Sequence, residues 1–389
     1  MLSQDIPRQT RRTRIVCISD THCQTPKLPK GDVLIHAGDL TNQGSYSELK
    51  KTVDWLEKAD FEAKIVVAGN HDITLDSGFY KEHGSSWRWP QPQDPDACRR
   101  LLTQSKSITY LENEAAKIYL NVMNGPRTCF KVYGSPCTPK AWNWAFQYEA
   151  EEATNLWDTI PQDTDIVVTH TPPKGHCDAA TKDDRSGCGV LLQALHRVRP
   201  MLAVFGHIHE ARGVERVRWT PSPDNGCLVE EFEVWKDPGV GSNKQSLVSL
   251  TTKGGCPPGN GSRLTRQSRI LTLSQGEDGC GGQPAAQASG VLQPFTLKST
   301  SRPDGVSQSE AKFRAMLGGA FEYRQEGAAS DVGLAKDAPD VEATERKETV
   351  MINAAFLGPR LSGTASKVFN KPVVVDVDLP VWCFDTDAE

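Results

Sequence analysis

The chain has 389 residues, 24% of them charged, and a formal net charge of -5 at pH 7. This length suffices for one large domain or two ordinary ones with a deep cleft. The small net charge excludes a global electrostatic bias toward nucleic acid or an anionic membrane, so an anionic substrate has to be held locally. The 11 cysteines form no Cys-x-x-Cys pair, which favours reduced thiols over a disulfide framework or a zinc ribbon.

The first residues lack the apolar core of a secretory signal, and no segment approaches the roughly 20 apolar residues of a membrane span. The sequence therefore predicts a soluble, cytoplasmic protein without membrane contact. The basic stretch at 11–14 is interpreted as an ordinary approach to a first strand rather than as a nucleic-acid or lipid patch.

Five short apolar runs in the first half predict buried strands, because β-branched residues dominate them and continuous apolar runs suit sheets covered on both faces. They lie at 15–18, 33–35, 65–68, 166–168 and 202–205. A capping-box pattern at Ser45 and Glu48 predicts a helix between the second and third runs. A second helix is predicted at 190–198. This order predicts an α/β layer structure.

The composition shifts to Gly, Ser, Thr, Gln and Asp from about 237 to 345, which predicts a long, largely disordered insertion. Such a segment could bind protein partners. Apolar runs at 350–355 and 373–379 then predict strands. The expected organisation is one domain with its main part at 12–236, an insertion at 237–345, and C-terminal strands at 346–385 that complete the domain.

Ligand-type side chains follow every one of the five predicted strands. Since ligands bind outside the carboxyl ends of strands in open α/β sheets, these side chains are expected to converge on one rim. A single such residue is more often a cap or a turn residue. However, five of the nine histidines fall in these strand-end motifs, which favours a metal site. The converging residues are Asp20, His22, Asp39, Asn70, His170, His207 and His209.

This mixture of nitrogen and oxygen donors suits Mn, Fe, Zn or Mg, and it is too large for one ion and sufficient for two. Asp39 is placed to bridge the two ions. Such a pair can clamp a phosphoryl group and activate a water for in-line attack. The sequence therefore predicts a binuclear phosphoesterase, with manganese as the first choice of metal.

The ordered motifs resemble those of the calcineurin-like metallophosphoesterase superfamily. Further motifs resemble its metallophosphoesterase-domain-containing branch, and the resemblance covers about 14–218 and 349–382. They are Gly134-Ser135-Pro136, Thr169-His170-Thr171-Pro172-Pro173, Gly187-Cys188-Gly189, Phe369-Asn370-Lys371-Pro372 and Asp378-Leu379-Pro380. The resemblance implies a four-layer α/β/β/α sandwich, interrupted here by the low-complexity insertion.

The resemblance also implies two ligand sets that share Asp39. One metal would be held by Asp20, His22, Asp39 and His209, and the other by Asp39, Asn70, His170 and His207. His71 would contact phosphate and protonate the leaving oxygen, while Asp72 would orient the imidazole and keep it charged.

The chain departs from the protein serine/threonine phosphatases after its second motif. Those enzymes continue with Asp-Arg-Gly, whereas residues 38–44 here read Gly-Asp-Leu-Thr-Asn-Gln-Gly. Loss of that arginine removes a bidentate phosphate contact. A phosphodiester or other small phosphoester, cyclic nucleotides included, is therefore favoured over a phosphoprotein. The alternatives are a phosphomonoesterase acting on nucleotides or phosphoproteins, and a weakly active scaffold that binds metal or nucleotide.

Several other residues have two interpretations. His36 lies inside a predicted strand and is expected in the core or behind the ligands. His83 and His196 have no partnering pattern, while His176 could line the pocket. The stretch at 142–146, with two tryptophans, could stack a nucleobase or pack its loop against the sheet. Asn353 could reach the rim or form a cap.

Overall fold

All five apolar runs predicted as strands form strands in the computed structural model, which describes residues 9–181, 184–221, 227–257, 346–359 and 367–382. The five strands are β1 (Thr10–Ile18), β2 (Val33–Ala37), β3 (Ala63–Val67), β9 (Ile166–Thr169) and β10 (Leu202–Phe205). All the described helices and strands belong to one compact unit.

The first sheet has six strands in the order β13-β15-β1-β2-β3-β4. Strands β1 to β4 run parallel to one another, and β15 pairs antiparallel with β1. The carboxyl ends of β1, β2 and β3 therefore lie at the same edge. The strands not yet given are β4 (Thr109–Tyr110), β13 (Ser246–Leu250) and β15 (Val373–Pro380).

The second sheet has seven strands in the order β12-β11-β14-β10-β9-β6-β5. Its central strands β14, β10, β9 and β6 are parallel, and antiparallel strands flank them. The new strands are β5 (Glu114–Tyr119), β6 (Cys129–Ser135), β11 (Gly213–Trp219), β12 (Val229–Val234) and β14 (Glu348–Asn353). A separate pair joins β7 (Thr138–Pro139) to β8 (Gln147–Tyr148).

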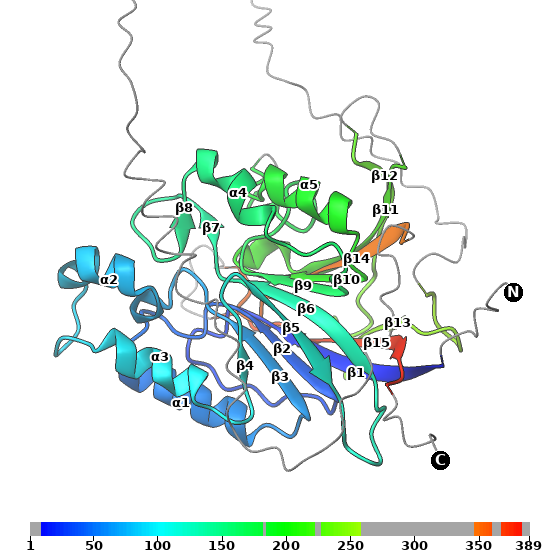
Figure 1. The fold of residues 1–389 in the computed structure, drawn as a ribbon, viewed down its shortest axis with the longest axis horizontal. Coiled ribbons are helices and arrows are strands. Elements are labelled where there is room, and N and C mark those ends of the chain that lie inside the picture. The colour runs from blue at the N-terminus through cyan, green and yellow to red at the C-terminus, as the bar shows by residue number, and fades with distance from the viewer. Residues whose placement is uncertain (1–8, 182–183, 222–226, 258–345, 360–366, 383–389) are drawn as a thin grey trace, which may run out of the picture. The chain divides into compact units, whose positions relative to one another are not determined.

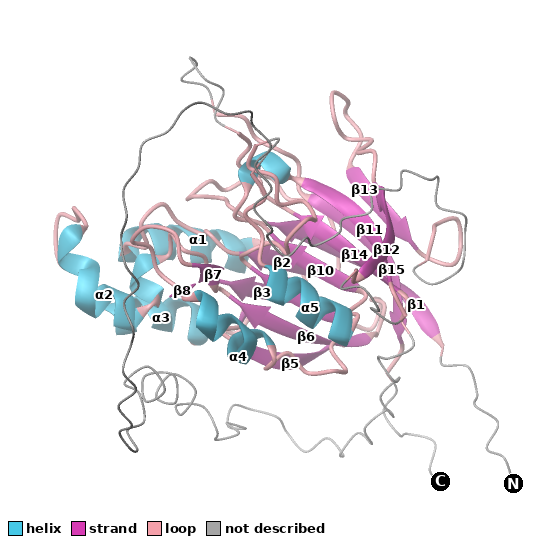
Figure 2. Cartoon of the chain, turned by 90° about the horizontal axis from the view of Figure 1, so that it is seen from above, coloured by secondary structure: helices cyan, strands magenta, loops and turns pink. Residues whose placement is uncertain are grey.

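Alternate residues along each central strand enter different hydrophobic cores, because successive side chains of a strand point to opposite faces. Ile15 and Cys17 of β1 join the core shared by both sheets, whereas Val16 and Ile18 join the core under the helices α1 and α3. On β10, alternate residues reach the shared core and the core that contains α4 and α5. The sheets are thus stacked with helices on both outer faces (Figures 1 and 2), which confirms the predicted α/β/β/α sandwich.

The predicted capping box begins the first helix. The Glu48 amide donates to the Ser45 hydroxyl at 3.3 Å, and the Ser45 amide donates to the Glu48 carboxylate at 3.1 Å. Such a cap contributes about 1 kcal/mol. None of the described helices is long and apolar enough to cross a membrane. The helices are α1 (Tyr46–Lys58), α2 (Ser77–His83), α3 (Pro95–Thr103), α4 (Ala153–Trp157) and α5 (Gly189–Val198), with short 3-10 turns at Ile73–Leu75, Gly84–Ser86, Ala150–Glu152 and His209–Ala211.

The ordered fold extends beyond residue 236, where the insertion was predicted to begin. Residues 237–257 are described and include β13, which pairs in parallel with β15 at the edge of the first sheet. The predicted start at 237 is therefore corrected, and the reason is that alternate residues of β13 are buried. The prediction of disorder for the rest of the insertion falls on 258–345, outside the described residues.

Candidate metal centre

The predicted ligand residues leave the ends of five strands that belong to both sheets. Backbone hydrogen bonds align the turns within each sheet, from the Asp20 amide to the Gly38 carbonyl at 2.9 Å and from the Gly206 amide to the His170 carbonyl at 3.1 Å. Contacts also cross between the sheets, since His170 Nδ1 lies 2.9 Å from the Ala37 carbonyl oxygen. The single rim expected from the sequence is thus formed by two sheet edges.

One group of donors has the spacing of a metal site. The ligand atoms of Asp20, His22, Asp39 and His209 all lie within 4.8 Å of one another. His209 Nε2 lies 3.3 Å from Asp20 Oδ1, and His22 Nε2 lies 3.6 Å from Asp39 Oδ2. The structure therefore brings together the residues of the first predicted ligand set.

The second predicted set is built around the other oxygen of Asp39. His170 Nε2 lies 3.3 Å from Asp39 Oδ1 and 3.1 Å from Asn70 Oδ1. The His207 ring lies edge-on to the His170 ring, with their centroids 5.0 Å apart. Asp39 thus contacts histidines of both sets through different oxygens.

Several of these residues have left-handed backbone conformations, which are uncommon outside glycine and cost free energy. Asp20, His22, Asp39 and His207 have φ angles of 53°, 44°, 52° and 68°. The bends after the strands are held by cross-strand contacts such as the His207 amide, which donates to Asp20 at 3.1 Å. Strain concentrated in this way is typical of functional sites.

The electrostatics of the cluster favour ionised carboxylates. Burial would raise the pKa of Asp20, but the imidazoles of His209 and His170 lower it to about 2. Burial likewise opposes ionisation of Asp39, yet His170 and its neighbours hold that pKa well below its usual range. Burial lowers the pKa of His170, but Asp39 outweighs it and raises the pKa to about 9. Metal ligands must be deprotonated, so the carboxylates are in the required state at neutral pH.

The donor set fits divalent metal ions. Asp20 and Asp39 are 0% and 2% exposed, and among the described residues their ion pairs are with histidines alone. Two buried anions close together repel each other, and a cation relieves that repulsion. Imidazole, carboxylate and amide oxygen are ligands of Mn, Fe and Zn.

Gly206 leaves room for the first ligand set. A Cβ at this position would come under 3.0 Å from Ser19 Oγ and Asp20 Oδ2. We expect Gly206→Ala to push Asp20 out of place and to weaken Mn binding about tenfold or more, because even supporting residues of metal sites contribute that much. Isothermal titration calorimetry of the metal-stripped protein with Mn measures this affinity.

Gly213→Ala is the matched control, since its Cβ would meet its nearest atom at an ordinary 3.5 Å. Equal Mn affinity in both variants would contradict the crowding at Gly206.

His71 stands beside the cluster. Its amide donates to Asp39 Oδ1 at 2.9 Å, and its Nδ1 lies 2.8 Å from the Asn42 carbonyl oxygen. Its ring lies edge-on to the His22 ring at 4.8 Å between centroids. The Asn42 contact, which no sequence motif indicated, fixes one ring nitrogen and leaves Nε2 for a substrate.

Asp72 does not have the position predicted for it. Its carboxylate accepts hydrogen bonds from the backbone amides of Gly69 at 2.9 Å, Leu40 at 3.1 Å and Thr41 at 2.9 Å. The expectation that Asp72 orients the His71 imidazole is therefore corrected. Asp72 is buried and binds the loop after β2 to the loop after β3, whereas the neighbouring His71 is half-buried and its ring lies against the rings of His22 and Trp144.

The remaining histidines and Asn353 have structural partners. His36 is buried, and its Nε2 lies 2.9 Å from the Thr21 hydroxyl, as expected for a residue behind the ligands. His176 is 1% exposed and pairs with Glu215 at 2.7 Å. The suggestion that His176 lines the pocket is thus wrong, because the side chain is buried and its hydrogen bond to Glu215 holds it in the interior. Asn353 donates to the Cys177 and Ile208 carbonyls, at 3.0 and 2.9 Å, which supports the capping interpretation.

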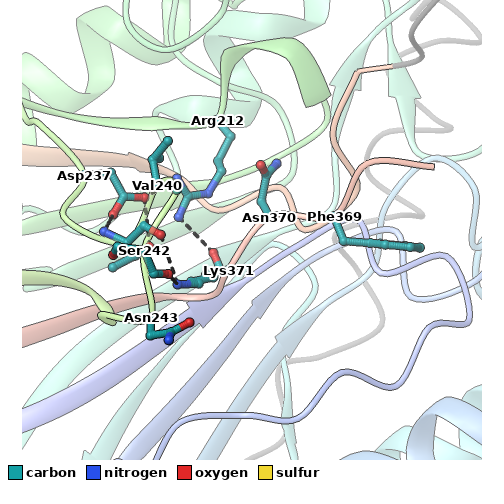
Figure 3. A pocket seen from close by; sticks show the side chains of 11 residues that line it. Arg212, Asp237, Val240, Ser242, Asn243, Phe369, Asn370 and Lys371 are labelled. Carbon is teal, nitrogen blue, oxygen red and sulfur yellow. Dashed lines mark hydrogen bonds and ion pairs between the residues drawn. The ribbon is translucent and has the colours of Figure 1, made fainter. Parts of the chain in front are cut away.

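A pocket of about 470 Å³ lies beside the turn that follows His209 (Figure 3). Arg212 donates to Asp237 at 2.7 Å and to the Lys371 carbonyl at 2.8 Å. The Lys371 ammonium donates to the carbonyls of Gly239, Ser242 and Lys244 at 2.9, 2.6 and 2.8 Å. These bonds fix the turn at 237–244, which leads into β13.

Replacing Asp237 by Asn should lower the free energy of unfolding by about 2 kcal/mol at pH 7, because Arg212 loses a charged partner. Burial opposes ionisation of Asp237, but the Arg212 hydrogen bond lowers its pKa. A lowered carboxyl pKa stabilises the fold above the unfolded-state value and loses that effect as pH falls through the folded-state value. The difference in unfolding free energy between wild type and Asp237→Asn should thus persist down to about pH 4 and become smaller below it.

Urea unfolding across this pH range measures the gap, and Asp54→Asn provides a control on an exposed ion pair. A gap that does not change with pH would contradict the role of the Asp237 charge.

The donors and their spacing suit a metal centre, and a family model matches the part of the chain that carries them. The model described as Calcineurin-like phosphoesterase matches residues 13–211, about half of the chain. The chain therefore belongs to the calcineurin-like phosphoesterase family.

Among individual proteins, the chain is similar to human Metallophosphoesterase domain-containing protein 1, with 39% identity over 54% of this chain and 64% of that protein. It is 33% identical to the Caenorhabditis elegans UPF0046 protein C25E10.12, over 54% of this chain and 73% of that protein. It is also 46% identical to Probable rhamnogalacturonate lyase C of Emericella nidulans, over 53% of this chain but 18% of that protein. The chain thus spans less than two thirds of the length of the human and Emericella proteins.

Likenesses to solved structures are weak. The Thermus thermophilus protein TT1561 has a TM-score of 0.32 and 13% identity, over 50% of this chain and 82% of that one. The purple acid phosphatase PPD1 of yellow lupin has a TM-score of 0.29 and 14% identity, over 55% of this chain and 40% of that one. At these scores neither likeness bears on the chemistry of this chain.

Proposed function

We propose that this chain hydrolyses phosphodiester bonds, cyclic nucleotides included, at a site that holds two divalent metal ions, with manganese as the first choice. The observation that carries the proposal is the position of Asp39, whose two oxygens face different histidines. Asp20, His22 and His209 complete one donor set around it, and Asn70, His170 and His207 the other.

Two ions held there would polarise the phosphoryl oxygens and acidify the attacking water. The residues of the chain supply the rest. The donors would fix where the phosphoryl group is bound, and His71, whose ring lies beside the cluster, would direct its Nε2 to the leaving oxygen. As the oxygen of water joins phosphorus and the P–O bond to the leaving group breaks, His71 gives a proton to that leaving oxygen. The proton released by water restores His71.

The charges of the site favour a diester over a monoester. Residues 38–44, at the position of the arginine clamp of the protein serine/threonine phosphatases, contain no arginine, and among the described residues the ion pairs of Asp20 and Asp39 include neither lysine nor arginine. A monoester dianion needs more positive charge than a diester monoanion, and arginine is the usual bidentate partner of a phosphate. Without that clamp, the single charge of a diester is the better match.

The test uses metal-stripped protein with bis(p-nitrophenyl) phosphate and p-nitrophenyl phosphate, each with and without added Mn. We expect Mn-dependent release of p-nitrophenol, faster from the diester. Preference for the monoester would favour the phosphomonoesterase alternative. Inertness of the Mn-loaded protein toward both esters would favour the binding scaffold.

A further inference from the structure

Aromatic rings extend away from His71 in an unbroken series. The Trp144 ring lies over the His71 ring at 4.1 Å between centroids, with a tilt of 37°. Trp87 follows at 5.0 Å from Trp144, and Trp89 stacks on Trp87 at 6.2 Å. These rings form an aromatic wall, which we define as Trp87, Trp89 and Trp144, next to an otherwise polar centre.

The loop that carries Trp144 is fixed to the metal-ligand loop. The Ala145 amide donates to the Asn70 carbonyl at 3.3 Å, and the Phe146 amide donates to Asp76 at 2.9 Å. Ala145 and Phe146 are buried, which anchors the loop in the core under α1 and α3. Trp144 is therefore held in a set position relative to Asn70 and His71.

Only part of the surface of the aromatic wall is buried against the rest of the protein. All three residues of the wall are half-buried and pack against the core under α1 and α3, with the indole nitrogens of Trp87 and Trp89 buried, so each residue keeps only part of its surface toward solvent. Core packing alone would favour full burial of such large apolar rings. Solvent-facing indole beside a phosphoester site is the kind of surface on which bases stack, because every base offers a π-face.

The position of the wall determines what it can contact. A general acid must reach within hydrogen-bond distance of the leaving oxygen, so the body of the leaving group extends past the His71 ring. Trp144 is the tryptophan whose ring lies against the His71 ring. A leaving group with a planar aromatic part can lie along the wall, whereas an aliphatic one gains little from it.

We propose that the aromatic wall, through Trp144, binds the nucleobase of a nucleoside leaving group and so selects nucleoside phosphodiesters as substrates. This rests on the proposed function. Trp144 acts as a specificity-determining residue by stacking on the base, and the reaction remains hydrolysis of a P–O bond by water.

The test compares adenosine 2′,3′-cyclic phosphate with the matched 1-O-methylribose 2′,3′-cyclic phosphate, using Mn-loaded wild type, Trp144→Leu and Trp144→Phe. We expect Trp144→Leu to lower kcat/KM for the adenosine ester about tenfold more than for the base-free ester, the size of one lost base stack. Trp144→Phe should keep most of the preference, because it keeps an aromatic face.

Trp142→Leu is the control within the same loop, since its indole is 89% exposed and it makes no ring contact with His71 among the described residues. It should leave the preference unchanged. An equal loss in Trp142→Leu would overturn the assignment to Trp144, as would a Trp144→Leu defect of the same size on both esters, which would mean that Trp144 only positions His71.

A binding measurement separates this inference from the proposed function. Calorimetry of the Mn-loaded proteins with AMP and with ribose 5-phosphate should give tighter binding of AMP, and Trp144→Leu should weaken AMP about tenfold while leaving ribose 5-phosphate unchanged. If the Mn-loaded protein hydrolyses neither bis(p-nitrophenyl) phosphate nor the cyclic esters but this binding pattern holds, the proposed function fails, whereas the binding of a nucleobase by the aromatic wall stands. Equal affinity of wild type for both ligands would overturn the inference.

Discussion

His71→Ala should lower kcat on bis(p-nitrophenyl) phosphate about 10²- to 10⁴-fold, the usual contribution of a general acid, while Mn remains bound. The physical reason is the position of the ring. It stands outside the group of closely spaced ligand atoms, and the contact of its Nδ1 with the Asn42 carbonyl leaves Nε2 to donate a proton to a substrate. Kinetic assays measure the loss of kcat, and the metal content of the same samples shows whether Mn remains bound.

The defect should depend on the leaving group. A poorly acidic leaving group such as phenol needs a proton more than p-nitrophenol does, so His71→Ala should lose more activity on diphenyl phosphate. His83→Ala is the control, as a histidine at the end of α2 whose ring packs on Phe79 instead of on the cluster. Loss of Mn together with activity in His71→Ala would assign this residue to the metal ligands.

Asp39→Asn should reduce Mn affinity at least about 100-fold and abolish most of the Mn-dependent hydrolysis. Changes to residues that merely support metal ligands already cost 10- to 100-fold, and Asp39 supplies a charged oxygen to each donor set. The side chain keeps its size, so the effect isolates the charge. Titration of metal-stripped protein with Mn gives the affinity.

Unfolding of Asp39 variants has to be measured in parallel, because Asp39 also accepts the His71 amide. Asp54→Asn on the exposed face of α1 shows how far an ordinary loss of a carboxylate charge shifts the measurement. Wild-type Mn affinity in a folded Asp39→Asn protein would remove Asp39 from the shared position and leave at most a single metal site.

The sequence predicted the strands and the ligand types because both signals are local. The buried runs of β1, β2, β3, β9 and β10 are continuous and apolar, and each ligand follows its own strand directly. The pairing of two sheets is not local. The prediction of two stacked sheets came from the family resemblance, because the residues of a strand such as β10 do not indicate which sheet it joins.

The sequence did not reveal contacts between residues far apart along the chain, and it suggested a contact between two neighbours that the structure does not have. Trp144 lies 73 positions from His71, and no spacing rule connects them. Asp72 was assigned to its neighbour His71, but in the turn after β3 the two side chains separate, and the acid binds the amides of Leu40 and Thr41. The segment of β13 did carry a signal, three apolar residues within the five at 246–250, which the polar composition around it concealed.

The order of strands has a consequence for synthesis on the ribosome. β15 lies between β13 and β1, and β14 lies between β11 and β10, so both sheets contain an internal strand encoded after residue 345. Until those strands emerge, β1 and β10 each present an open hydrogen-bonding edge, the kind of surface that pairs with other chains. The nascent protein therefore carries every predicted metal ligand before it can close either sheet, and protection by chaperones would matter most in that interval.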